Sequence, residues 1–389
     1  MRTLVCLSVL FLTALIAMAQ TSEFTAVADK IVNHSLEVKP GEVVIIIGTV
    51  AENELMEALY VSVAKAGGQP VVQLSLPFAS KKAFMEMPEE YLGMTSTYDL
   101  FEARIADCYI YTGSVQDPDL WSDVPEERAA IARKSQDPLR YAYTLSHNRV
   151  VSLGQAGGIP SKAYAESVGV SYDELLAMFW KSVGTDFDKM LSNGKQISAL
   201  LKPGSILKLT TKEGTNLSFK ISKNEPVLNT GRTKDTKIDI GPTATYLPAG
   251  EIYVPIDLTS AEGTLVVTRF DFRGNQVENL RLKFAKGSIV SVEADKNGEL
   301  ITEFFEQHPE STKSLSVFDL GLNPDSHPLG GLNYISYEMA GIICLFVGDN
   351  SWAGGDISTG ASLNFFQPDA TLTVNGKPLV IDGKLSTPE

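Results

Sequence analysis

Histidine, cysteine and basic residues are all scarce in this chain. Its 389 residues include four histidines and three cysteines, and 47 aspartates and glutamates outnumber 33 lysines and arginines. The formal net charge of −14 disfavours nucleic acid and acidic membrane surfaces as partners, because phosphate binding needs a basic face. Disulfide-stapled secreted proteins usually carry more cysteines. We therefore predict that Cys108 and Cys344, which both lie in apolar segments, are buried thiols.

Several short motifs that would identify a reaction are also absent. No G-x-G-x-x-G follows the first expected strand and no G-x-x-x-x-G-K-[ST] occurs, so we do not expect a nucleotide site. The motifs H-E-x-x-H, C-x-x-C and G-x-S-x-G are missing too, which leaves thermolysin-like zinc chemistry, zinc ribbons and the α/β-hydrolase elbow unsupported. A Ser-His-Asp set stays open, because the fold and not sequence spacing brings its members together.

The N-terminal segment differs from the rest of the chain. Met1-Arg2-Thr3 supplies a positive charge, 4–16 is an apolar run, and Ala17-Met18-Ala19 places small residues where signal peptidase needs them. The run is shorter than the roughly 20 residues that span a bilayer, and no basic flank follows it. We predict a cleaved signal peptide at 1–19 and an exported protein, periplasmic or secreted, with no membrane span after cleavage.

The chain is long enough for two domains with separate cores. In the first half, β-branched or apolar runs alternate with segments of helical spacing. The expected strands are 43–47, 71–76, 108–111 and 150–153, and the expected helices are 24–36, 52–66, 125–134 and 171–183. This alternation is typical of a parallel sheet layered by helices. We therefore predict an α/β domain over 20–200.

After about residue 200 the pattern changes to short alternating segments divided by Gly, Asn and Asp. Expected strands include 206–210, 217–221, 265–272, 277–284 and 289–292, and one helix is expected at 299–307. We predict a mainly antiparallel, β-rich domain over 201–389.

The stretch from Val317 to Asn364 contains three short apolar segments that each end in a turn rich in Gly, Asn and Asp. Polar residues therefore recur at strand ends, where sites tend to be built. Four carboxylates near these turns could form a glycosidase-type pair, but in an acidic protein we expect them in a solvated rim: Asp319, Glu338, Asp349 and Asp356. Trp352 is either a stacking platform for a ligand or a packing residue.

A set of short motifs carries a family resemblance. In order along the chain they are A-K-A-G-G-Q-P-V-V, E-G-T-N-L-S-F, L-P-A-G-E-I-Y-V-P, G-L-N-P, G-D-N-x-x-A-G-G and T-V-N-G-K-P-L-V-I-D-G-K-L. The chain resembles metalloaminopeptidases of the aminopeptidase T and aminopeptidase S type. The resemblance implies a two-domain exopeptidase fold, a homodimer and a pair of divalent metal ions in the β-rich domain.

Only one family metal ligand is retained under this resemblance. Glu251, in Leu247-Pro248-Ala249-Gly250-Glu251, matches the glutamate of the family's Pro-x-Gly-Glu turn. The other family positions, which hold Glu, His, Tyr and a His-x-Asp pair, fall on Val317, Cys344, Ser351, Ser362 and Asn364. Valine cannot coordinate a cation, and a neutral amide binds hard cations far more weakly than a carboxylate does. Of the four histidines, only His327 lies close enough in sequence to act as a substitute.

We therefore expect an exported, aminopeptidase-like protein that has lost most metal ligands, holds no cofactor and binds a peptide or small-molecule ligand without catalysis. The six aligned positions above are the candidates for its ligand pocket. The alternative is an active aminopeptidase that removes N-terminal residues. It would hold zinc, cobalt or manganese in a rebuilt site, with Glu251 joined by Cys344, His327 or Asp319.

Overall fold

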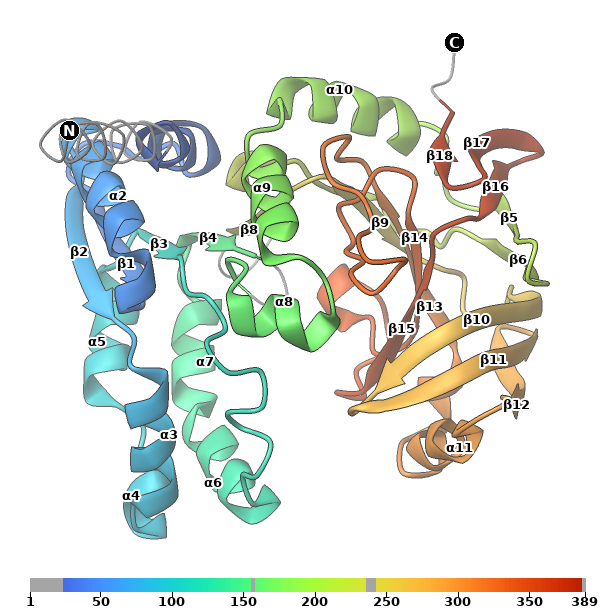
Figure 1. The fold of residues 1–389 in the computed structure, drawn as a ribbon, viewed down its shortest axis with the longest axis horizontal. Helices are drawn as coiled ribbons and strands as arrows, with labels where there is room; N and C mark the ends of the chain where they lie inside the picture. The colour runs from blue at the N-terminus through green and yellow to red at the C-terminus, as the bar shows by residue number, and fades with distance from the viewer. Residues whose placement is uncertain (1–23, 155–157, 236–242, 387–389) are drawn as a thin grey trace, which may run out of the picture. The chain divides into compact units, whose positions relative to one another are not determined.

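The computed structural model describes residues 24–154, 158–235 and 243–386, which form two compact units (Figure 1). The first unit comprises the described residues of 24–184 and 231–248, and the second those of 185–230 and 249–386. The predicted signal peptide at 1–19 lies outside the described residues. Within those ranges, no helix is both long enough and apolar enough to cross a bilayer.

The first unit is built on a parallel sheet with the strand order β2-β1-β3-β4-β8. Every neighbouring pair in it is parallel. The strands are β1 (Val43–Gly48), β2 (Gln69–Leu74), β3 (Cys108–Tyr111), β4 (Arg149–Leu153) and β8 (Thr243–Leu247). The β-branched run V-V-I-I-I forms β1, whose neighbours on both sides are strands, as a strand in the middle of a parallel sheet requires.

Helices cover both faces of this sheet. Helix α2 packs on the face that carries Val44 and Ile46, where its Met56 lies against Gly48. On the other face, the ring of Tyr143 from α7 meets that of Tyr109 from β3, with centroids 5.9 Å apart. A helix over 24–30 runs into the π-helical η1 (Ile31–Ser35). The further helical segments are η2 (Val50–Glu52), α2 (Asn53–Lys65), α3 (Pro77–Glu86), α4 (Glu89–Leu92), α5 (Thr97–Ile105), α6 (Glu126–Ser135), α7 (Asp137–Thr144), α8 (Lys162–Val168), α9 (Tyr172–Val183) and η3 (Thr233–Asp235).

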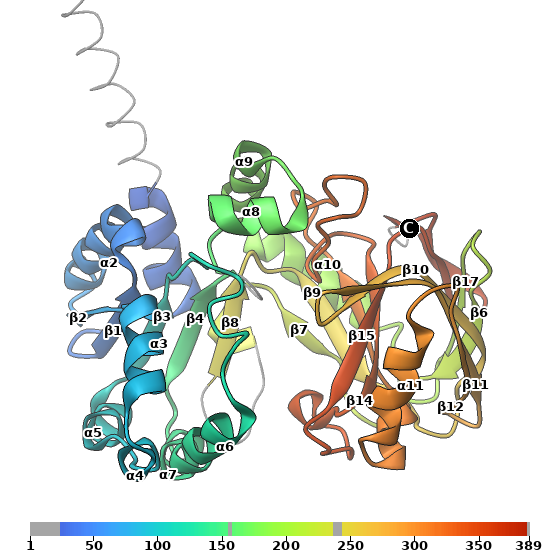
Figure 2. The same ribbon diagram turned by 60° about the horizontal axis from the view of Figure 1, so that its bottom comes forward.

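The second unit contains two antiparallel sheets that share one core (Figure 2). The larger, of order β12-β11-β10-β6-β5-β16-β17-β18, consists of β5 (Ile206–Thr210), β6 (Asn216–Lys220), β10 (Glu262–Phe272), β11 (Asn275–Ala285), β12 (Ser288–Glu293), β16 (Thr371–Val374), β17 (Lys377–Ile381) and β18 (Lys384–Leu385). The smaller, of order β15-β14-β13-β9-β7, consists of β7 (Val227–Asn229), β9 (Glu251–Pro255), β13 (Leu315–Gly321), β14 (Ile343–Gly348) and β15 (Ser362–Gln367). The helical segments of this unit are α10 (Phe187–Ser198), α11 (Gly298–Glu306), η4 (Glu310–Lys313) and η5 (Ser351–Ala353).

Phenylalanines from both sheets and from α11 meet in the core of the second unit. Phe219 and Phe284 come from the larger sheet, Phe318 and Phe365 from the smaller, and Phe305 from α11. A parallel α/β unit followed by antiparallel sheets confirms the predicted fold class. Cys108 and Cys344 are free and buried, as predicted.

The predicted single domain boundary near residue 200 differs from this division in two places. Helix α10 belongs to the second unit, where Gly194 lies against Leu228 and Leu322. The segment 231–248 returns to the first unit, because β8 pairs in parallel with β4. The local sequence of β8 favours a strand but does not encode which sheet the strand will join, so this return is not visible in the alternation pattern.

Candidate functional site

The smaller sheet of the second unit has one face in the core and one that carries the aligned site positions. Ile252, Phe318 and Leu345 point into the core. On the opposite face, Asp319 of β13 lies between Tyr253 of β9 and Cys344 of β14. In the row on one side of Asp319, Val317 is paired with Phe346, which is paired with Asn364 of β15. In the row on the other side, Glu251 is paired with Gly321. We call this the site face.

The site face therefore brings together four of the six candidate pocket residues, namely Glu251, Val317, Cys344 and Asn364. Ser362, also aligned with a ligand, is exposed at the start of β15. Ser351 lies in η5 and is exposed, with its hydroxyl and its backbone N–H both donating to the carboxylate of Asp349 at 2.7 and 3.0 Å. His327 is exposed in the segment after β13.

Two retained turns hold Glu251 in place. Gly250 has φ +126°, and a Cβ built there would come within 2.8 Å of the backbone nitrogen of Asn323. The Asn323 side chain donates to the Ala249 carbonyl at 2.7 Å, and Leu322 N–H donates to the Gly250 carbonyl at 2.7 Å. The P-A-G-E and G-L-N-P motifs thus contact each other directly, and a glycine is required at their closest approach.

Three carboxyl groups near this face are buried, which corrects the expectation of a solvated rim for two of them. The side chains of Glu251, Asp319 and Glu338 are only 2–3% exposed. Glu338 accepts hydrogen bonds from the hydroxyls of Ser326, at 2.8 Å, and Ser336. The Oδ1 atom of Asp319 is buried and has no hydrogen-bond partner within the described residues.

Burial determines the protonation of this cluster. It raises the pKa of Asp319 well above the usual range, and the charges of Glu251 and Glu338 raise it further. Burial likewise raises the pKa of Cys344 well above that of an ordinary thiol, and the charge of Asp319 adds to this effect, although a hydrogen bond with Asn364 opposes it. Burial therefore favours the protonated forms of the Asp319 carboxyl and the Cys344 thiol.

Aromatic rings pack over the middle of the site face. The ring centroid of Trp352 lies 5.2 Å from that of Tyr253 and 5.2 Å from that of Phe346. The ring of Tyr337 stacks on Phe346 at 5.8 Å and meets Phe366 at 4.9 Å. Tyr253, Tyr337, Phe346 and Phe366 pack with Val317 and Cys344 in one apolar cluster, so these four rings occupy the surroundings of two aligned ligand positions.

Comparison with known proteins identifies the family. A model described as thermophilic metalloprotease (M29) matches residues 20–327. The chain belongs to the thermophilic metalloprotease family. No curated protein matched the sequence.

Two solved structures are similar to this thermophilic metalloprotease family member over almost the whole chain. Wild-type AmpT from Thermus thermophilus covers 94% of this chain and 99% of its own, with 17% identity and a TM-score of 0.66. The 2,5-dihydroxypyridine dioxygenase from Pseudomonas putida KT2440 covers 95% and 98%, with 17% identity and a TM-score of 0.59. At 17% identity these likenesses show the fold alone. The two structures share this fold but are named for different proteins, so the chemistry of this chain must be argued from its site residues.

The site residues do not fit the pair of divalent ions that the family resemblance implies. Such a pair needs bridging carboxylates with further charged or imidazole ligands, whereas the aligned positions on the site face beside Glu251 hold Val317, Cys344 and Asn364 among aromatic rings. Across the ranges that the structure describes, no group of three or more His, Cys, Asp or Glu side chains is arranged to hold a metal ion.

Sequence reasoning missed the burial of Asp319 and Glu338 and the aromatic cover of the site face. One signal was available: in V-F-D-L of β13, Asp319 is the only charged residue in a strand that is buried along its whole length. A lone acid in a run that is apolar on both faces indicates a buried carboxyl. The aromatic cover comes from four separate segments and has no comparable local signal.

Proposed function

We propose that this family member is an exported, non-catalytic protein that binds a peptide or another small ligand at the exposed border of the site face. The observation that carries the proposal is the packing of Phe346, Tyr337 and Tyr253 around Val317 and Cys344, where the resemblance places metal ligands. Replacement of a buried carboxylate by valine removes a desolvation cost that only a bound cation would otherwise offset.

The range of the family match supports this proposal. It ends at His327, before the segments that contain Cys344, Ser351, Ser362 and Asn364. The part of the chain that carries four of the aligned ligand positions therefore lies outside the matched range. The retained turns at Gly250 and Asn323 maintain the scaffold. Retained scaffold turns together with replaced ligand positions are expected where a fold persists while the reaction is lost.

The exposed border of the site face offers a surface for a ligand. Trp352 is 49% exposed. Ser351, directly before it in the sequence, and Ser362, at the start of β15, are exposed too. An aromatic ring with hydroxyl groups nearby suits a peptide or another molecule with apolar and polar parts. Glu251 is buried and pairs with Gly321 at the end of β13 away from Ser362, so on this proposal it contributes to the shape of the face and does not contact the ligand.

A rebuilt metal site is the second candidate function. The buried, unpartnered Oδ1 of Asp319 favours it, since a cation beside Glu251 would satisfy that oxygen. In this case the protein is an active aminopeptidase that binds zinc, cobalt or manganese through Glu251, Asp319 and Cys344.

Metal content and hydrolysis separate the two candidates. The purified protein would be incubated with zinc, cobalt or manganese, dialysed and assayed for bound metal and for hydrolysis of a leucyl chromogenic substrate, beside Glu251→Gln. We expect substoichiometric metal and no hydrolysis that depends on Glu251. Stoichiometric metal, together with hydrolysis that Glu251→Gln abolishes, would establish the rebuilt site instead.

Binding at the border would be tested by thermal shift with a panel of short peptides. We expect a peptide that raises the unfolding temperature of the parent protein and loses this effect in Trp352→Ala. The same substitution at Trp121, which is 48% exposed in the first unit, is the matched control. A panel without any Trp352-dependent shift contradicts binding at this border.

The resemblance also implies a homodimer, which we propose for this chain. Sedimentation velocity of the processed protein is expected to show a species of twice the chain mass. A single species at the chain mass over the micromolar range contradicts the dimer.

A further inference from the structure

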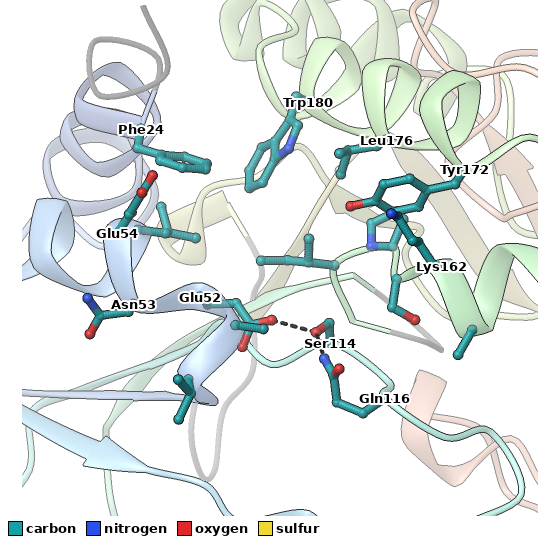
Figure 3. A pocket seen from close by; sticks show the side chains of 17 residues that line it. Phe24, Glu52, Asn53, Glu54, Ser114, Gln116, Lys162, Tyr172, Leu176 and Trp180 are labelled. Carbon is teal, nitrogen blue, oxygen red and sulfur yellow. Dashed lines mark hydrogen bonds between the residues drawn. The ribbon is translucent and has the colours of Figure 1, made fainter. Parts of the chain in front are cut away.

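A cavity of about 780 Å³ in the first unit lies at the carboxyl ends of three parallel strands (Figure 3). Residues 50–55 follow β1, Ser114 and Gln116 follow β3, and 159–163 follow β4. In open parallel sheets, ligands bind outside the carboxyl ends of the strands, where the strand order reverses. In the order β2-β1-β3-β4-β8, that reversal lies between β1 and β3. The volume is within the usual range for small-molecule sites.

One wall of the cavity is apolar and comes from helix α9. Tyr172, Leu176 and Trp180 are spaced by four residues, so they lie along one face of the helix. All three are half-buried, whereas Leu175 and Phe179, on another face of α9, are buried in the unit. Helix α9 thus has an apolar stripe toward the cavity in addition to its buried face. Such a stripe suits an aromatic or aliphatic group of a ligand.

Phe24 extends this wall across the cavity. Its ring meets Trp180 edge to face, with centroids 5.6 Å apart, and the two rings lie together in Figure 3. A third ring placed against them would gain the favourable geometry of aromatic pairs. The wall therefore favours an aromatic side chain over a purely polar ligand.

The floor of the cavity is polar and already satisfied. Glu52 accepts from the backbone and hydroxyl of Thr49 at 2.9 and 2.7 Å and from the hydroxyl of Ser114, which in turn accepts from Gln116. This network fixes the floor and leaves Glu52 buried. The Glu52 carboxyl group disfavours a negatively charged phosphate ligand, and so does the absence of a glycine-rich phosphate loop from the sequence.

Two opposite charges border the cavity. Glu54 and Lys162 both line it and are exposed, and Figure 3 shows them on different sides. Neither forms a salt bridge with any residue in the described ranges; the Lys162 ammonium lies 5.8 Å from the ring of Tyr172. An acid and a base held apart by an apolar wall are complementary to a molecule with an ammonium and a carboxylate at its two ends.

We propose that this cavity binds a short peptide with free ends and an aromatic side chain. The ammonium faces Glu54, the carboxylate faces Lys162, and the aromatic ring packs against Phe24 and Trp180. An extended chain spans about 3.3–3.6 Å per residue, so two or three residues give the ends more separation than a single amino acid allows. The inference does not rest on the proposed border site, because every residue here belongs to the first unit.

Calorimetry with four capped forms of one dipeptide tests the charge arrangement. The probes are leucyl-phenylalanine, its N-acetyl form, its C-terminal amide and the form with both caps, each titrated into the processed full-length protein. We expect one equivalent of the free dipeptide to bind, and each cap to weaken binding roughly twofold to fivefold, the range of a partly exposed charge pair. Absence of binding, or equal binding of the free and doubly capped forms, overturns the proposal.

Two surface substitutions assign each end of the peptide. Glu54→Gln is expected to abolish discrimination between the free and N-acetylated dipeptides, while leaving discrimination against the amide intact. Lys162→Met is expected to do the reverse. The matched controls are Glu89→Gln and Lys65→Met, exposed charges outside the cavity, which should leave all four affinities unchanged.

The remaining outcomes are also decisive. Glu251→Gln should leave the four affinities unchanged; if it abolished them, the peptide would bind at the site face and not in this cavity. Discrimination that survives both Glu54→Gln and Lys162→Met overturns the assignment of the ends. Free phenylalanine that binds as tightly as the dipeptide contradicts a peptide ligand and identifies a single amino acid, with the same pair of charges, as the occupant.

Discussion

Single side chains decide whether the site face can hold charge, and Val317 is the most informative of them. It is fully buried beside Asp319 and among aromatic rings. Val317→Glu restores the residue type of the family position. Without a cation, however, it introduces an uncompensated buried carboxylate, which costs about 3–5 kcal/mol. We expect a loss of that size in the free energy of unfolding at pH 7, measured by urea denaturation.

Two comparisons give this prediction its meaning. Val317→Ile keeps the position apolar and should cost less than about 1.5 kcal/mol. If addition of zinc returned the stability of Val317→Glu to that of the parent, the surrounding residues would be able to complete a metal site, which contradicts our account of the site face.

Asp319 gives a prediction about pH. Because its pKa is raised in the folded state, the native protein holds a proton that the unfolded chain releases above about pH 4. The parent therefore loses stability from this group as pH rises, and Asp319→Asn removes that loss. We expect Asp319→Asn to be more stable than the parent at pH 8, with a difference that shrinks toward pH 4, in urea titrations across this range.

The control for this experiment is Asp356→Asn, which changes an exposed acid near the same turns. It should show no pH-dependent difference from the parent. A difference between Asp319→Asn and the parent that is constant from pH 4 to pH 8 contradicts the neutral state of Asp319.

At the residue scale, motifs predict where a side chain lies in the fold. Glu251 was placed by a turn whose glycine and asparagine contacts the structure shows directly. Val317, Cys344 and Asn364 were placed by counting from neighbouring turns, and strand pairing brings all three to the same face as Glu251. The burial of Asp319 and Glu338 was not predicted, because composition favours exposed acids and only the packing of several segments buries these two.

Elements of secondary structure depend on a few close approaches, and Gly250 provides a test. Its φ of +126° and its contact with Asn323 leave no room for a Cβ. Gly250→Ala should therefore destabilise the protein by more than the roughly 1–3 kcal/mol of backbone strain alone. Urea denaturation would measure it.

Gly204 is the matched control for this prediction, because its φ of +79° carries strain but no atom lies within 4 Å of a built Cβ. Gly204→Ala should show the strain alone. Equal losses in the two variants would mean that the approach of the two retained turns contributes nothing to stability.

Strands were easier to predict than helices, for a physical reason. Runs such as V-V-I-I-I and alternations such as those in β11 carry the period of the element in adjacent residues. Helix α10 was missed because its apolar positions are interrupted by Ser, Asn and Gly194, and the glycine is there to admit Leu228. The predicted helix over 171–183 is present as α9, and the Ser171 hydroxyl caps it by accepting from the Glu174 N–H at 3.4 Å.

At the scale of the whole molecule, the sequence predicted two domains but not how the chain passes between them. The strand β8 completes the parallel sheet after the chain has formed three strands of the antiparallel sheets, β5, β6 and β7. Long-range pairing of this kind depends on partners more than 80 residues apart, such as Leu153 and Leu247, and no local pattern reports it.

Export concerns the chain as a whole and gives the last prediction. The family match begins at residue 20, directly after the predicted cleavage point, so removal of 1–19 would leave the matched region intact. We expect protein expressed with its own N-terminus in a bacterium to be recovered outside the cytoplasm and to begin at Gln20, by intact mass and N-terminal sequencing. Ala19→Arg should block this processing, because signal peptidase needs a small residue there, whereas Ala14→Leu should preserve it, because the segment stays apolar. Recovery of a chain that keeps Met1 in the cytoplasm contradicts export. The acidic, histidine-poor composition would then need to be explained inside the cell.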